Sequence, residues 1–296
     1  MKIGILTFNW AVNYGAILQM YALYNYLFDQ KYEVFIINYS PEELSNLYSL
    51  SIIQKPVNIK KVVRKTLENI YKKKLFNKFN NFINKNFQMT NKIINRTDLK
   101  NIVKQFDLII VGSDQVWNYE ITKKYIEDYL LLEIDCKKLA YAASLGKNNI
   151  KDEVKDMFQR SLKNFECISL REYDSIPYLK SIYNRNDYVS SVDPVFLLDK
   201  KQWIRFATQS DYKISERNYI LVYMLEFDEY LLSKAKELSK KNNLPIYSIE
   251  IPYIRIKKEF KGIKKLHDVG LNDFVKLFNN AAYILTNSFH GTAFSL

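Results

Sequence analysis

The chain of 296 residues has few side chains that could form disulfide bonds or hold a metal ion. Its two cysteines, Cys136 and Cys167, lack CxxC spacing, and its two histidines, His267 and His290, lack an HExxH pattern. The cysteines are therefore expected to be free thiols in a reducing compartment. The same scarcity argues against a zinc site held by protein side chains. Neither a metal nor another cofactor is predicted.

Long apolar runs and nucleotide-binding signatures are missing as well. No stretch of about 18 apolar residues is present, so no membrane-spanning helix is predicted. The apolar run at 1–6 is too short for a signal peptide and is followed closely by Asn9 and Asn13. These absences predict a cytoplasmic protein. Neither GxGxxG nor a Walker loop occurs, so dinucleotide and P-loop nucleotide binding gain no support.

The net charge of +12 comes from one stretch of the chain. Residues 55–104 hold fourteen Lys and Arg residues against Glu68 and Asp98, an excess equal to the charge of the whole chain. Apolar residues such as Val63 and Leu67 recur there at helical spacing, which predicts one or two amphipathic helices. Two interpretations stay open: a solvated helix face, or a surface that contacts anionic lipid at the inner face of the membrane. Nucleic-acid binding is not favoured, because no recognised motif accompanies the charge.

Strands and helices alternate along the chain. The patterns predict strands at 2–8, 33–38, 108–111, 139–143, 167–170, 189–192, 219–223, 246–250 and 283–286, and helices at 14–28, 151–163, 174–183, 229–241 and 271–279. The opening strand–helix–strand unit predicts a parallel sheet covered by helices. Asp193-Pro194 predicts a turn, and the weakly patterned residues 203–217 predict the approach to a second lobe. A last helix is expected to begin near His290, and with the chain ending at Leu296 the second lobe is expected to be incomplete.

Polar and small residues follow several of the predicted strands. Asn13 and Gly15 lie between the first strand and its helix, where helix N–H groups could bind an anion or where Asn13 could simply cap the helix. Four polar or aromatic side chains follow the strand at 108–111 within seven residues: Ser113, Gln115, Trp117 and Asn118. The acidic residue Asp114 lies among them. A turn would explain Ser113 and Asp114, whereas the tryptophan face and the amide groups of Gln115 and Asn118 fit a sugar site better.

Two cationic candidates lie at the ends of later strands. Arg171, after the strand at 167–170, could bind a carboxylate or phosphate through two hydrogen bonds, or form a salt bridge with Glu172 or Asp174. His290 lies at a strand-to-helix junction, where an imidazole can exchange a proton near neutral pH. His267 lies in a charged stretch and is expected to be solvated.

Taken in order, these segments resemble the polysaccharide pyruvyl transferase family. The matching stretches are NYGAILQMYAL (13–23), DLIIVGSDQVWN (107–118), YAASLG (141–146), SLRE (169–172), VDPVFLL (192–198) and NSFHGTAFSL (287–296). The resemblance implies an α/β, GT-B-like fold, in which two Rossmann-like lobes with parallel sheets face a cleft. The expected lobes are residues 1–198, with the basic helical insertion near 55–104, and residues 199–296.

The resemblance also implies a reaction and roles for particular residues. The donor would be phosphoenolpyruvate, and the acceptor a sugar hydroxyl of a surface polysaccharide or its lipid-linked oligosaccharide precursor. Relatives hold the donor through an Arg and a His that correspond to Arg171 and His290. Those relatives carry Arg-Leu-His where this chain has Ser288-Phe289-His290, so one cation of the family pattern is missing.

These considerations lead to one set of site residues and two rival functions. His290 and Asp114 are the catalytic candidates. Donor contacts are predicted for Arg171, Ser288, Phe289, Asn13 and Gly15, and acceptor contacts for Ser113, Gln115, Trp117 and Asn118. The first rival is a GT-B glycosyltransferase that uses a nucleotide-sugar. The second is a carbohydrate-binding protein without catalytic activity.

Overall fold

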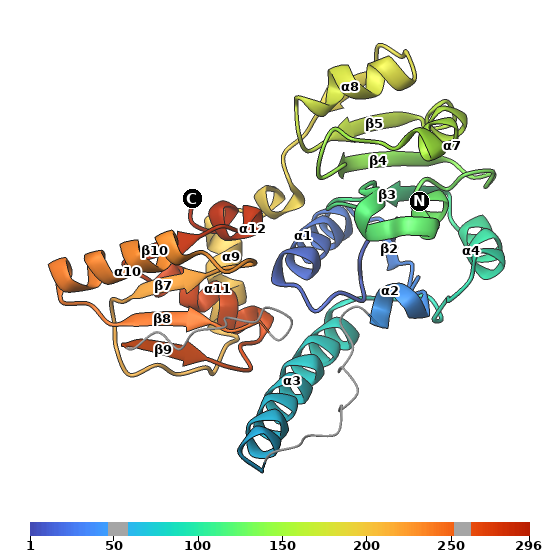
Figure 1. Cartoon of the computed structure of the whole chain (residues 1–296). Coiled ribbons are helices and arrows are strands. Elements are labelled where there is room, and N and C mark those ends of the chain that lie inside the picture. The colour runs from blue at the N-terminus through green and yellow to red at the C-terminus, as the bar shows by residue number, and fades with distance from the viewer. Residues whose placement is uncertain (47–58, 252–261) are drawn as a thin grey trace. The chain divides into compact units, whose positions relative to one another are not determined.

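The computed structural model describes residues 1–46, 59–251 and 262–296, which form two compact units (Figure 1). One unit comprises Met1–Leu47 and Asn86–Leu198, and the other Tyr48–Lys85 and Asp199–Leu296. The basic segment is thus shared between the units, and its first residues, 55–58, lie outside the described residues. The lobe limits 1–198 and 199–296 stay a prediction.

The first unit is built on a six-stranded parallel sheet with the order β2-β1-β3-β4-β5-β6. Its strands read as short apolar runs because a parallel sheet is buried on both faces. The strands are β1 (Lys2–Leu6), β2 (Glu33–Ile36), β3 (Leu108–Val111), β4 (Lys138–Ala143), β5 (Cys167–Leu170) and β6 (Tyr188–Ser190). The helices are α1 (Tyr14–Asp29), α2 (Glu42–Asn46), α4 (Arg96–Ile102), η1 (Val103–Gln105), α5 (Tyr119–Thr122), η2 (Lys123–Tyr125), α6 (Ile126–Tyr129), α7 (Asp152–Leu162), α8 (Ser175–Ile182) and η3 (Pro194–Leu197).

The second unit is built on a four-stranded parallel sheet with the order β10-β7-β8-β9. Its core includes Ile220 and Val222 of the central strand, packed with Leu232 and Ala235 of the helix that follows. The strands are β7 (Ile220–Tyr223), β8 (Ile246–Ile249), β9 (Ile263–Leu266) and β10 (Tyr283–Thr286), and the helices are α3 (Ile59–Asn86), α9 (Lys200–Thr208), α10 (Glu229–Asn242), α11 (Leu271–Asn280) and α12 (Phe289–Ala293). The predicted α/β class with two parallel-sheet lobes is therefore confirmed.

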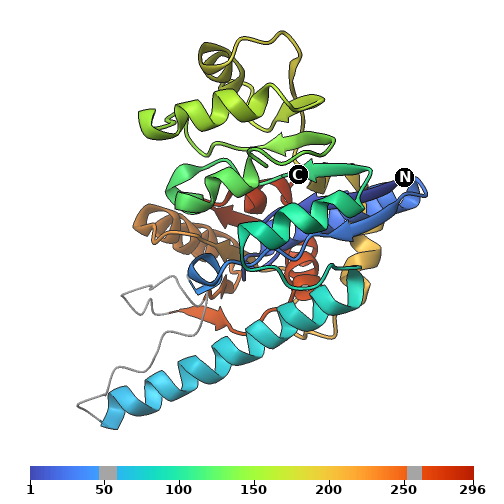
Figure 2. The same ribbon diagram turned by 90° about the vertical axis from the view of Figure 1, so that its right-hand side faces the viewer.

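Three sequence-based expectations need correction or refinement. The apolar residues at helical spacing in the basic segment, from Val63 to Ile83, lie in one continuous helix, α3 (Figure 2), and a second helix, α4, follows within 55–104. Residues 200–208 form helix α9, begun by a capping box between Asp199 and Gln202, where no regular element was expected. Strand β9 was not predicted, because two of its four residues are lysines. Within the described part of the chain, none of the helices has the length and apolar character of a membrane span.

Candidate functional site

In the first unit the direction of winding changes between β1 and β3. From β1 the chain passes to β2 on one side, and from β3 it passes through β4 and β5 to β6 on the other. In open parallel sheets the crevice outside the carboxyl ends of two such strands is the usual ligand site. The loop 7–13 after β1 and the loop 112–118 after β3 meet at this edge, since Thr7 Oγ1 donates to the carbonyl oxygen of Ser113 at 2.9 Å.

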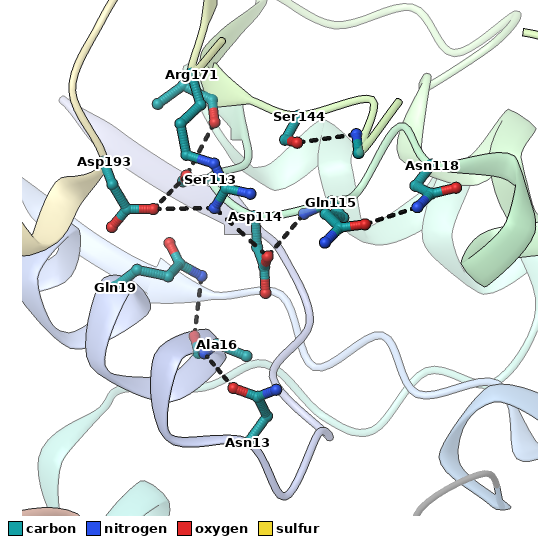
Figure 3. Close-up of polar contacts among 12 residues, drawn as sticks. Asn13, Ala16, Gln19, Ser113, Asp114, Gln115, Asn118, Ser144, Arg171 and Asp193 are labelled. Carbon is teal, nitrogen blue, oxygen red and sulfur yellow. Dashed lines mark hydrogen bonds and ion pairs between the residues drawn. The ribbon is translucent and has the colours of Figure 1, made fainter. Parts of the chain in front are cut away.

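Asn13 begins helix α1 as its cap. Its Oδ1 accepts a hydrogen bond from the Ala16 N–H at 3.2 Å, and its backbone is extended, as a cap residue requires (Figure 3). The capping interpretation of Asn13 is confirmed. Gly15 lies buried in the first turn, where the helix dipole places partial positive charge.

Ser113 is fully buried and serves the fold. Its Oγ lies 2.9 Å from the carbonyl oxygen of Ala142 and 3.2 Å from Oδ2 of Asp193. Asp193 itself is buried and uses Oδ1 to accept from the Val195 N–H at 3.1 Å, which caps η3. Ser113 therefore offers no exposed group to an acceptor sugar, and its predicted acceptor contact is not retained. The role of Asp193 as more than a turn residue was missed.

Arg171 is clamped between carboxylates, as Figure 3 shows. Its Nε donates to Glu172 Oε1 at 3.0 Å, and its Nη1 lies 3.2 Å from Asp193 Oδ2 and 3.6 Å from Asp114 Oδ1. Only 6% of the side chain is exposed. The salt bridge with Glu172 that the sequence left open is present.

The charge around Arg171 is negative overall, because three carboxylates surround one guanidinium. Burial by itself lowers the pKa of Arg171, but the fields of Asp114, Asp193 and Glu172 outweigh it and raise that pKa above its ordinary value. The guanidinium is therefore permanently charged. An incoming anion would have to compete with carboxylates already in place.

Asp114, Gln115 and Asn118 are partly exposed at the same edge. Asp114 Oδ1 accepts from the Gln115 N–H at 2.9 Å, and Asn118 Nδ2 donates to Gln115 Oε1 at 2.6 Å (Figure 3). Gly146 allows this pairing: a Cβ there would come within 2.4 Å of Gln115 Oε1, and its φ is +71°. These side chains form a fixed row of amide and carboxylate groups that a sugar hydroxyl could contact.

Trp117 does not belong to this row. It is 1% exposed, its Nε1 donates to the carbonyl oxygen of Tyr129, and its ring packs edge-on against Phe158 and Phe165. Its predicted acceptor contact is therefore wrong, because a ring buried on both faces cannot stack on a sugar.

Two other aromatic side chains near this edge keep exposed surface, and sequence reasoning overlooked both. Tyr173, two residues after Arg171, is 76% exposed. Trp10, in the loop after β1, is partly exposed, and its Nε1 donates to the hydroxyl of Tyr129 at 3.2 Å. Their positions directly after β5 and β1 were the available signal.

The second unit has a corresponding change of winding direction between β7 and β10. The chain runs from β7 through β8 to β9, then returns to place β10 on the other side of β7. Asn287 joins the two loops at this edge: its Oδ1 accepts from the Leu225 N–H and its Nδ2 donates to the Glu226 carbonyl oxygen, both at 2.9 Å. The His290 motif thus begins at the place where a parallel sheet binds ligands.

Ser288 caps the short helix α12. Its Oγ accepts from the Gly291 N–H at 3.2 Å, and only 2% of the residue is exposed. Burial raises the pKa of Tyr223, against a smaller lowering by a hydrogen bond with Ser288. The hydroxyl is thus engaged in the fold, and it carries no charge to replace the missing arginine.

His290 is 8% exposed and lies in the first turn of α12. The ring of Phe289, itself 48% exposed, meets the imidazole edge-on at a centroid distance of 5.1 Å. His267 is not simply solvated, since it stacks on Tyr71 with ring centroids 4.5 Å apart. Among the described residues, no group of three or more His, Cys, Asp or Glu is placed to hold a metal ion.

Comparison with known families agrees with this arrangement. The model of the family described as Polysaccharide pyruvyl transferase matches residues 13–296, nearly the whole chain. The chain belongs to the polysaccharide pyruvyl transferase family. It is therefore a transferase, and the candidate residues of both sheet edges lie inside the matched region. No curated protein matches the chain by sequence.

Several solved structures overlap this member of the polysaccharide pyruvyl transferase family at low identity. UDP-N-acetylglucosamine 2-epimerase from Rickettsia bellii is 12% identical with a TM-score of 0.49, covering 99% of this chain and 75% of the epimerase. UDP-GlcNAc 2-epimerase from Methanocaldococcus jannaschii is 12% identical with a TM-score of 0.48, covering 100% and 81%. Arabidopsis thaliana UGT89C1 complexed with UDP-L-rhamnose is 10% identical with a TM-score of 0.46, covering 99% and 76%.

Proposed function

We propose that the chain transfers an enolpyruvyl group from phosphoenolpyruvate to a sugar hydroxyl of a surface polysaccharide or its lipid-linked precursor, forming a pyruvate ketal. The observation that carries the proposal is the family match over residues 13–296. The position of His290 at the change of winding direction in the second sheet supports it. The proposed chemistry uses no cofactor beyond the donor itself.

The donor's chemistry sets what the site must supply. A proton adds to the methylene carbon C3, C2 becomes electrophilic, and a sugar hydroxyl oxygen attacks C2 while its proton passes to a base. The bond between C2 and the phosphate oxygen then breaks with its electron pair leaving on phosphate, and a second sugar hydroxyl attacks C2 and gives its proton to the base or to the departing phosphate. The reaction therefore needs an acid near C3, a base near the hydroxyl, and cations or N–H groups around the donor's two anions.

In the second unit the proposal gives His290 the acid role or the phosphate contact. An imidazole can donate a proton or hold an anion through its N–H groups. Ser288 holds the turn in which the imidazole sits, and Phe289 packs against its edge. Ser288 and Phe289 are proposed as donor contacts through this turn.

In the first unit the proposal gives Arg171 the donor carboxylate, and Asp114 the role of base toward a sugar hydroxyl. The carboxylate of Asp114 is partly exposed in the row that Gln115 and Asn118 form, and this exposure supports the second assignment. Gln115 and Asn118 would contact the acceptor. Asn13 and Gly15 would support the donor through the first turn of α1.

Ligand binding separates this proposal from its rivals. The Tm of the protein would be measured in the presence of phosphoenolpyruvate and, separately, of each member of a panel of nucleotide-sugars. We expect a rise in Tm with phosphoenolpyruvate. A rise with a nucleotide-sugar alone would support a glycosyltransferase, and no shift with either ligand would support a carbohydrate-binding protein.

The two histidines provide a matched pair of variants. His290→Ala should lower kcat/KM for phosphate release by about 10²–10⁴-fold, the usual contribution of a general acid. His267→Ala should leave turnover within about 2-fold, since its ring stacks on Tyr71. Phosphate release would be measured with phosphoenolpyruvate and a panel of sugar acceptors. Equal turnover in both variants would refute the role of His290.

Arg171 needs a test that separates binding from folding, since it also holds three carboxylates. Arg171→Lys keeps the charge but loses the bidentate geometry, so KM for phosphoenolpyruvate should rise by roughly 10-fold or more. Arg185→Lys changes an arginine that pairs with Asp187 and donates to the carbonyl oxygens of Leu162 and Phe165, none of which is a candidate site residue, and should leave KM unchanged. If Arg171→Lys lowers Tm but leaves KM unchanged, Arg171 serves the fold and not the donor.

A further inference from the structure

Helix α3 has one side packed into the second unit and one side exposed. Leu75, Phe79 and Phe82 are buried, and the ring of Phe82 meets that of Phe206 at 5.6 Å. Lys78 Nζ lies 3.0 Å from Oδ2 of Asp273, whose side chain is 7% exposed. The helix is therefore held in a fixed rotation about its axis.

The exposed side combines lysines with large apolar side chains. Ile70, Lys73 and Lys74 follow the i, i+3, i+4 spacing of one helix face, and Lys73 and Lys74 are exposed. Ile70 is 45% exposed, and Phe76, three residues after Lys73, is 40% exposed. We call these four residues the α3 face. Isolated apolar side chains on a surface are ordinary, but here two of them lie among lysines on a single helix.

Apart from Glu68, the charged side chains of this helix are all basic. From residue 69 to residue 86 the sequence contains Lys72, Lys73, Lys74, Lys78 and Lys85 and no Asp or Glu. Further basic residues, Lys60, Lys61, Arg64 and Lys65, precede them in the same helix, although their side chains lie outside the description. Helix α3 is continuous over 28 residues (Figure 2), so its lysines are distributed along one long element.

We propose that the α3 face binds the surface of an anionic lipid bilayer, with Ile70 and Phe76 entering the headgroup region and Lys73 and Lys74 contacting lipid phosphates. Basic helices with exposed apolar side chains lie in the interface plane of such membranes. The packed side of α3 remains on the protein during this contact, so binding needs no unfolding. The inference does not depend on the transfer reaction, because it rests on the helix alone.

The apolar side chains decide between a bilayer and a nucleic acid as the occupant. Phosphate binding along a nucleic acid uses the cations and gains nothing from an isoleucine. A bilayer uses both kinds of side chain, since lysine attracts the protein to the surface and apolar groups enter below the headgroups. Removing the apolar groups while keeping the charge therefore distinguishes the two.

The test is co-sedimentation of the full chain with two kinds of vesicle, phosphatidylcholine alone and equal parts phosphatidylcholine and phosphatidylglycerol. We expect binding only to the second, weakening as sodium chloride is raised. The variant K73Q/K74Q should reduce partitioning by roughly 25-fold, since a lysine near an anionic surface contributes a factor of about five. The variant I70S/F76S should reduce it several-fold at unchanged charge.

The control is K240Q/K241Q, which removes the same charge from two exposed lysines in the last turn of α10. It should bind the anionic vesicles as the unmodified protein does, and unchanged circular dichroism would show that each variant is folded. Equal losses in K73Q/K74Q and K240Q/K241Q would overturn the proposal. So would binding to double-stranded DNA that matches vesicle binding and is unaffected by I70S/F76S.

Discussion

The two units hold their candidate residues at equivalent places in the fold by different means. In the first unit, the edge at the ends of β1 and β3 is fixed by charge: Arg171 lies among Asp114, Glu172 and Asp193. In the second unit, the edge at the ends of β7 and β10 is fixed by hydroxyl groups and close packing around Gly291. The same topology can therefore present either a charged network or an imidazole in a small helix turn.

This difference bears on what each edge can do in a transfer reaction. Charged groups locked in mutual pairs resist rearrangement, so the first edge suits the orientation of hydroxyl groups by fixed acceptors. The second edge places an imidazole, which can carry a proton in or out, in a helix turn capped by Ser288 and beside the ring of Phe289. Removing a charged group from the first edge and crowding the packing at the second would show whether the two edges are stabilised differently.

The largest effect is expected from removing the buried carboxylate of the first edge. Asp193→Ala would leave Arg171 buried with one partner fewer. It would also remove the carboxylate oxygens that Ser113 Oγ and the Val195 N–H contact. The expected loss is about 3–5 kcal/mol of unfolding free energy. Urea unfolding followed by circular dichroism measures it.

Asp187→Ala provides the control for that measurement. Its carboxylate is 54% exposed and pairs with Arg185 at 2.5 Å, so the same substitution there should cost less than about 1 kcal/mol. Similar losses for Asp193→Ala and Asp187→Ala would show that the network at the first edge contributes no more than a surface ion pair.

A smaller effect is expected from crowding the second edge. In Gly291→Ala the new Cβ would lie 2.2 Å from Thr286 Oγ1 and 3.0 Å from Tyr223 Cδ1. Overpacking of this kind costs about 1–3 kcal/mol. Because Thr286 Oγ1 is the closest atom, T286A/G291A should lose less than the sum of the single variants. Strict additivity in urea unfolding would mean that the clash with Thr286 is not the cause.

The sequence predicted the sheets better than it predicted the contacts at their edges. Strands β1, β3, β5 and β7 were predicted from apolar runs, because burial on both faces leaves a clear mark on composition. Strand β9 has one buried residue and two lysines, and α9 is short, so neither produced a strong pattern. The capping box at Asp199 was the available signal for α9.

Side-chain roles depended on burial, which spacing does not specify. Trp117 and Ser113 follow β3 in the same loop as Asp114, yet the first two turn into the core and only the third reaches the surface. A salt bridge was one of the two interpretations left open for Arg171, but its partner Asp193 lies 22 residues away. Contacts over such separations arise from the strand order, and no local pattern reveals them.

The smallest effect concerns an ion pair of the second unit near the amino ends of its strands. Glu216 Oε1 lies 2.6 Å from Lys264 Nζ, and Glu216 also bonds Ser215 and Tyr247. The hydrogen bond from Lys264, followed by those from Ser215 and Tyr247, lowers the pKa of Glu216 to about 2 from its ordinary value of 4.5. A charge thus supports this end of the second sheet, whereas packing supports the other.

The sign of its pH dependence follows from the lowered pKa. A carboxyl group whose pKa is lower in the folded state stabilises that state above its unfolded pKa, and this contribution disappears as the pH falls from about 4.5 toward about 2. The stability difference between the unmodified protein and Glu216→Gln should therefore be constant above about pH 5 and shrink below it. Solvent screening keeps it small, because the Lys264 side chain is 55% exposed. Urea unfolding at a series of pH values measures this difference in the free energy of unfolding. If the difference is unchanged at the lowest pH, packing of the Glu216 side chain, and not its charge, supports the amino ends of β7, β8 and β9.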